Sequence, residues 1–114
     1  MMLLKSFEEM GIAFDFSNKF TVARVPYSYA DAEDFALHLV YSLKPYVAKK
    51  RGVGDAEVVL IAISKNNKVV VASNNEWPRN HLYKHFKKPS LGYAQFYDNV
   101  DPELIIEKIK DLYK

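Results

Sequence analysis

An acid-free stretch from Trp77 to Tyr97 carries the residues of this chain that are best suited to bind a ligand. Its first half, 77–89, interleaves aromatic rings with cations and two histidines. Cationic side chains bind phosphate, and flat rings offer faces on which bases stack. We therefore expect single-stranded nucleic acid to bind here with little sequence preference, in a groove whose second wall is the basic run 49–51. The predicted contact residues are Lys49, Lys50, Arg51, Trp77, Arg79, Tyr83, Lys84, Lys87, Lys88, Tyr93 and Tyr97.

Helical spacing divides this segment between the surface and the core. If residues 79–87 form a helix, Leu82 and Phe86 share a face that we expect to pack into the core. The histidines and two of the lysines fall on another face, so the rings and charges do not all project together. The alternative interpretation is that the lysines form an ordinary solvated surface with no ligand.

The two histidines of this segment could serve a different chemistry. His81 and His85 are spaced so that, on a helix, both can bind one metal ion. A metal site needs further ligands, and no spacing selects His38 or any carboxylate as the third one. The zinc-protease pattern also fails because Leu82 stands where it needs a glutamate. We therefore predict no metal or other cofactor, and a small metal-dependent hydrolase or nuclease is the third hypothesis.

No other motif in the chain predicts catalysis. Acidic residues gather at 31–34 and 55–57, but the metal-dependent nuclease pattern needs a lysine two residues after Glu57, where Val59 stands. The Gly-x-Gly at 52–54 lacks both the third glycine of a dinucleotide loop and the Lys-Ser/Thr of a phosphate loop. No serine has the Gly-x-Ser-x-Gly setting of a hydrolase. The sequence therefore favours a binding protein over an enzyme.

The composition sets the broad class. A chain of 114 residues is expected to form one globular domain. The lack of cysteine excludes a disulfide scaffold, thiol catalysis and cysteine-ligated zinc. The longest apolar run, 58–63, is too short to cross a membrane. The start of the chain is too short for a signal segment. We therefore expect a cytoplasmic protein that does not bind a membrane.

The charges are segregated along the chain although the net charge is only +2. A second acid-free window, 35–54, contains Lys44 and the basic run 49–51. Such asymmetry predicts one basic and one acidic face. Complementary faces, exposed tyrosines and a sheet edge that could pair between subunits also suit a homodimeric protein-interaction module, which is the alternative function.

The elements that must position these residues follow from periodicity and turn chemistry. Gly11 and Gly52 should end helices. Pro45 should kink its helix, or end it before a short restart at 45–50. In chain order, we expect a helix at 3–10, a hairpin of strands 12–16 and 20–25, a helix at 30–44, a hairpin of strands 57–64 and 68–73, a helix at 79–87, a strand at 92–97 and a helix at 101–113.

These elements predict an α+β fold with the order α-β-β-α-β-β-α-β-α. Two hairpins and one further strand should form a mostly antiparallel sheet of about five strands, with the helices packed on it. The strand at 57–64 is apolar on both faces, so we expect it to lie centrally and to be covered on both sides.

Overall fold

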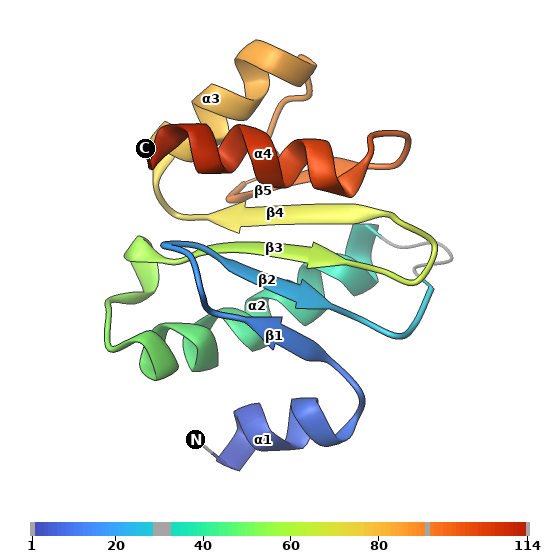
Figure 1. Ribbon diagram of the computed structural model, residues 1–114, viewed down its shortest axis with the longest axis vertical. Helices are drawn as coiled ribbons and strands as arrows, with labels where there is room; N and C mark the ends of the chain where they lie inside the picture. The colour runs from blue at the N-terminus through green and yellow to red at the C-terminus, as the bar shows by residue number, and fades with distance from the viewer. Residues whose placement is uncertain (1, 29–32, 91, 114) are drawn as a thin grey trace.

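One sheet with helices on both faces forms the protein (Figure 1). The computed structural model describes residues 2–28, 33–90 and 92–113, and it describes their side chains except at 2–4 and 33–39. The sheet has five strands whose order in space follows their order in the chain. The elements are α1 (Met2–Glu9), β1 (Ala13–Asp15), β2 (Thr21–Arg24), α2 (Glu33–Arg51), the 3-10 turn η1 (Asp55–Glu57), β3 (Val59–Ile63), β4 (Val69–Ser73), α3 (Glu76–Phe86), β5 (Ala94–Tyr97) and α4 (Pro102–Leu112).

The sheet is mixed. The pairings β1–β2, β3–β4 and β4–β5 are antiparallel, whereas β2 and β3 run parallel. Parallel neighbours need a crossover connection, and α2 provides it by returning the chain to the end of the sheet where β2 began. The predicted α+β class and five-stranded sheet are confirmed. The description of the sheet as mostly antiparallel is replaced by a mixed one, because β3 does not reverse direction relative to β2.

The central strand β3 is buried on both faces, as predicted. Leu60 and Ala62 pack in a cluster with side chains of α1 and α2, and Ile61 packs in a second cluster with side chains of α3 and α4. Every residue of β3 is buried, because each face of the sheet has its own helical cover (Figure 1). The β-branched run of this strand therefore serves two cores at once.

Helix α2 passes through Pro45 without ending, so of the two predicted outcomes the one in which the helix ends and restarts at 45–50 is wrong. It runs as one helix to Arg51, while the predicted start at 30–32 lies outside the described residues. Pro45 is exposed, and Val47 beyond it is buried against the sheet. Packing of the second half on the sheet thus outweighs the hydrogen bond that proline removes. Neither α2 nor any other helix in the described ranges has the length and apolar character of a membrane span.

Helix α3 begins three residues earlier than predicted. The Asn75 side chain caps it by accepting a hydrogen bond from the Trp77 backbone N–H at 3.1 Å. Pro78 lies in the first turn, where a missing N–H leaves no helical hydrogen bond unmade. Lys87 ends the helix in the left-handed conformation, with φ of 55°. The early start places Trp77 on the first turn of the helix.

Candidate nucleic-acid interface

Segments that are far apart in the sequence meet at one end of the sheet. Strands β2 and β3 begin there and β4 ends there, because β2 and β3 are parallel and β4 is antiparallel to β3. The same end, on the left in Figure 1, gathers the β1–β2 turn, the end of α2, the start of α3 and the end of α4. We call the following residues the sheet-end surface: Lys19, Phe20, Lys50, Arg51, Trp77, Lys110 and Tyr113.

A row of three aromatic rings crosses the sheet-end surface from the core to the solvent. Phe20 is buried, and its ring lies 6.1 Å from that of Tyr113 at an interplanar angle of 29°. The ring of Trp77 meets Tyr113 edge-on, with centroids 6.0 Å apart and an angle of 75°. Trp77 is 54% exposed. The partly buried Tyr113 thus connects a core ring to a ring that faces the solvent.

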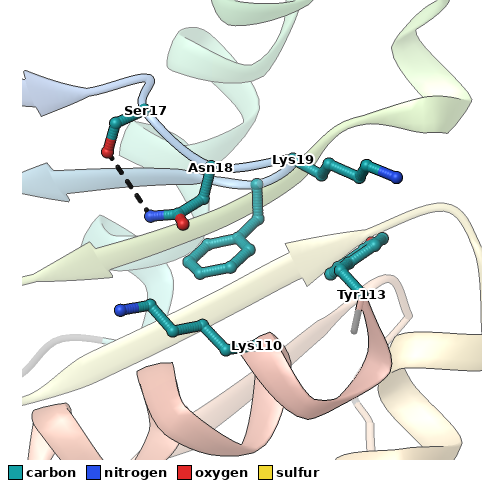
Figure 2. A pocket seen from close by; sticks show the side chains of 6 residues that line it. Ser17, Asn18, Lys19, Lys110 and Tyr113 are labelled. Atoms are coloured by element: carbon teal, nitrogen blue, oxygen red, sulfur yellow. Dashed lines mark hydrogen bonds between the residues drawn. The ribbon is translucent and has the colours of Figure 1, made fainter.

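A hollow of about 490 Å³ lies beside this aromatic row (Figure 2). Lys19 enters it from the β1–β2 turn, and Lys110 enters it from α4. Figure 2 shows the two lysines on opposite walls, with their ammonium groups pointing away from each other. The hollow therefore combines aromatic surface with positive charge at both ends. The residues that line it are Ser17, Asn18, Lys19, Phe20, Lys110 and Tyr113.

Arg51 fixes the basic end of α2 against the β1–β2 turn. Its guanidinium donates to the Thr21 hydroxyl at 3.2 Å and to the backbone oxygen of Asn18 at 2.9 Å. Lys50 lines a second hollow of about 240 Å³ beside it, and Lys49 is exposed in the same helical turn. The predicted second wall therefore adjoins the turn at 17–20. Its cations also suit the negative end of the helix dipole.

A second group of cations surrounds Tyr93 at the start of β5. Arg79 donates from Nε to the Asn75 carbonyl at 3.2 Å and from Nη1 to the Gly92 carbonyl at 3.0 Å. Its guanidinium carbon lies 5.7 Å from the centre of the Tyr93 ring, and the Lys44 ammonium lies 5.8 Å from it. The predicted residues Arg79 and Tyr93 are thus brought together, and Lys44 joins them from α2.

Lys44 is the most unusual charge of this group. Burial lowers the pKa of its ammonium most strongly, while Asp55 acts in the opposite direction and Arg79 lowers the pKa further. The sequence shows Lys44 only as one more cation in an acid-free window. Its burial depends on which face α2 turns toward the sheet.

The remaining cations of the predicted segment lie at the other end of α3. Tyr83, Lys84, Lys87 and Lys88 are all exposed. The Lys87 ammonium lies 5.8 Å from the centre of the Tyr83 ring, so these two side chains contact each other. Lys88 lines a different hollow, which also contains Asp98. The predicted binding segment is therefore divided between the two ends of one helix.

Tyr97 lies in the core and offers no ring face to a ligand. It is 2% exposed, and its ring packs edge-on against Phe86 at 5.5 Å. Tyr93 and Tyr97 are both predicted contact residues, but β5 begins at Ala94, so Tyr93 precedes the strand whereas Tyr97 lies inside it and is buried. Burial raises the pKa of the Tyr97 hydroxyl. Its oxygen has no hydrogen-bond partner among the described residues.

The two histidines lie side by side on α3. The rings of His81 and His85 are 4.9 Å apart, and Nε2 of His81 is buried without a hydrogen-bond partner in the described part of the chain. Partial desolvation lowers the pKa of His85, followed by the charges of Lys108 and His81. No group of three potential metal ligands occurs among the residues whose placement is described. The side chain of His38 and the acidic cluster at 31–34 lie outside the described side chains.

The function of the sheet-end surface, and of the group formed by Lys44, Arg79 and Tyr93, has to be inferred from the residues themselves. They combine exposed rings with cations that come from the β1–β2 turn and from the three helices α2, α3 and α4. No protein-family model, curated protein or solved structure shows significant similarity to this chain.

Proposed function

We propose that the protein binds single-stranded nucleic acid through the sheet-end surface, with little sequence preference and without catalysing a reaction. The observation that carries this proposal is the row Phe20–Tyr113–Trp77, with Lys19 and Lys110 on the walls of the hollow beside it. Exposed rings flanked by lysines are the usual construction of a single-strand site, because every unpaired base has a face that can stack.

Each part of the surface has its own task in this proposal. The Trp77 ring stacks on a base, and Tyr113 supports it from behind. Lys19, Lys110 and Lys50 are flexible cations that bind phosphates. Arg51 donates two hydrogen bonds to groups of the protein itself. Its role is therefore to hold the β1–β2 turn in the position in which Lys19 can bind the nucleic-acid strand.

The site favours unpaired bases for a geometric reason. Trp77 lies in the first turn of α3 and is largely exposed, and its ring is steeply inclined to that of Tyr113 rather than stacked on it. A ring in this position can stack on a base that is turned out of a strand. The bases of a duplex have their faces covered by neighbouring bases and cannot reach it.

A fluorescence titration tests the proposal, because the chain has one tryptophan. A single-stranded oligonucleotide should quench Trp77 emission, and its affinity should fall steeply as salt increases. The duplex of the same sequence should quench it less. If neither quenching nor salt-dependent affinity occurs, the proposal fails. Sedimentation in the same buffer gives the oligomeric state, and quenching by acrylamide shows whether Trp77 is accessible. A dimer in which Trp77 is protected from acrylamide would favour the homodimeric module instead.

A further inference from the structure

Lys44 is a mostly buried cation that has no hydrogen-bond or ion-pair partner among the described residues. The residue is 2% exposed. Its ammonium group makes no hydrogen bond or ion pair with any residue that the structure describes. Its ammonium instead lies over the ring of Tyr93 at 5.8 Å. Buried ammonium groups are costly unless they are paired, so an unpaired one needs an explanation.

A second cation faces the same ring. Arg79 uses Nε and Nη1 to bind backbone carbonyls, which leaves Nη2 without a hydrogen bond to the described residues. Asp55 influences Lys44 through its charge but does not form an ion pair with it. Two positive groups therefore converge on Tyr93, and the described protein supplies no anion between them.

This pair of cations lies close to the protein surface, because Arg79 is itself partly exposed. Tyr93 is 49% exposed, and Tyr41 is also exposed. Gly92 lies between these two tyrosines: it has a φ of +62°, and a Cβ added there would stand 3.5 Å from the Tyr41 hydroxyl oxygen. The hydroxyl of Tyr41 therefore lies beside the turn that carries Tyr93.

We propose that Lys44 and Arg79 together bind a phosphate monoester, and that its source is the terminal phosphate of the bound nucleic-acid strand. The choice of source rests on the function proposed above. In this arrangement the phosphate competes with the Tyr93 ring for the two cations, and the exposed part of that ring contacts the terminal nucleotide.

Charge and access both favour a terminal phosphate over an internal one. A phosphate monoester carries nearly two negative charges at neutral pH, which match the two cations. An internal phosphodiester carries one charge and has a sugar on either side, so it cannot approach an ammonium as enclosed as that of Lys44. Arg79 adds a planar donor group, whose geometry suits phosphate oxygens.

The test compares four probes on the whole 114-residue chain. Three are versions of one oligonucleotide, with a 5′-phosphate, with a 3′-phosphate or with neither, and the fourth is inorganic phosphate. We expect one of the two phosphorylated oligonucleotides to bind the protein about tenfold more tightly than the unphosphorylated oligonucleotide does. Inorganic phosphate should raise the melting temperature. In the Lys44→Met variant both effects should disappear, while the unphosphorylated strand keeps its affinity within about twofold.

Two further variants keep the test decisive. Lys65→Met makes the same change at an exposed lysine in the β3–β4 turn, at the opposite end of the sheet, and should leave both effects intact. Arg79→Gln should remove them as Lys44→Met does, which covers the case in which Lys44→Met does not fold.

The outcomes separate this inference from the function on which it rests. If all three oligonucleotides bind equally and inorganic phosphate has no effect, the phosphate site is refuted and the strand-binding proposal stands. If no oligonucleotide binds but phosphate stabilises the protein through Lys44, the anion site is supported with free phosphate as its source, and strand binding is refuted. If Lys65→Met removes the effects as fully as Lys44→Met, the preference is unspecific and the site is refuted.

Discussion

The two ends of α3 carry the same kinds of residue but have different surroundings. Trp77 and Arg79 lie at the N-terminal end, where strand ends, turns and the ends of α2 and α4 meet. Tyr83 and Lys87 lie near the C-terminal end, exposed and in contact with each other. The difference shows that composition can mark a segment, whereas a site needs a second wall from elsewhere in the chain.

Charge reversal should separate the two ends most strongly. Lys19→Glu with Lys110→Glu should weaken binding of a single-stranded oligonucleotide by about 100-fold at low salt and reduce the salt slope by about 2, since each lysine binds one phosphate. Lys84→Glu with Lys87→Glu makes the same change in net charge at the other end and should cost much less. Fluorescence anisotropy at several salt concentrations measures both. Equal losses would mean that only net charge matters.

The aromatic residues of the two ends give the next comparison. Trp77→Ala should cost about 1–3 kcal/mol of binding free energy, because it removes the exposed stacking face. Tyr83→Ala removes a ring of similar exposure at the other end and should cost less than about 0.5 kcal/mol. Titration of a labelled oligonucleotide measures the difference. A larger effect from Tyr83 would move the binding surface to the outer face of α3.

The charge of Lys44, which lies close to Arg79 at the N-terminal end of α3, should lower the stability of the fold. Lys44→Met removes a buried, unpaired charge and keeps most of the side-chain volume, so it should raise the free energy of unfolding by about 0.5–2 kcal/mol at neutral pH. Lys84→Met, at the exposed end, should change it by less than about 0.5 kcal/mol. Urea denaturation followed by circular dichroism measures both. Destabilisation by Lys44→Met would show that this ammonium has a structural partner.

Tyr97 packs against Phe86 at the C-terminal end of α3. Removing its hydroxyl should have the smallest of the expected effects. Its hydroxyl is buried without a partner among the described residues, so Tyr97→Phe should raise the free energy of unfolding by up to about 1 kcal/mol. Burial raises the pKa of Tyr97 in the folded state above the ordinary value of 10.0. Above that pH the unfolded chain loses this proton first, so stability falls as pH rises.

Denaturation between about pH 9 and pH 11 checks this pH dependence. The loss of stability should be smaller in Tyr97→Phe than in the parent protein. Tyr93→Phe is the matched control, because it removes a hydroxyl from a tyrosine that is half exposed rather than buried. Parallel profiles for the parent protein and Tyr97→Phe would mean that Tyr97 ionises as freely as an exposed tyrosine.

The sequence was sufficient to predict the elements of this fold. The β-branched runs on either side of the turn at 65–67 predicted β3 and β4, and the Asp101 cap with Pro102 predicted the start of α4. The parallel pairing of β2 with β3 has no local signal. It depends on α2 continuing through Pro45 and returning the chain to the other end of the sheet, which is decided by packing.

The candidate site could be predicted only in part. Trp77 and the basic run 49–51 stand out in the sequence because rings and charges are neighbours there. Lys19 comes from the β1–β2 turn, whereas Lys110 and Tyr113 come from the end of α4, and only the fold brings these two segments together. The opposite exposure of Tyr93 and Tyr97 follows from where β5 begins, and a boundary of this kind is set by pairing with β4.

The crossover between β2 and β3 also bears on how the chain folds. A short turn joins β3 to β4, and the connection through α3 to β5 is shorter than the one through α2 that must form before β2 can join β3. We expect β1 and β2 to dock late during refolding, with the weakest amide protection in the sheet. The turn that carries Lys19 comes with them, so the capacity to bind a strand should arise at the last step of folding.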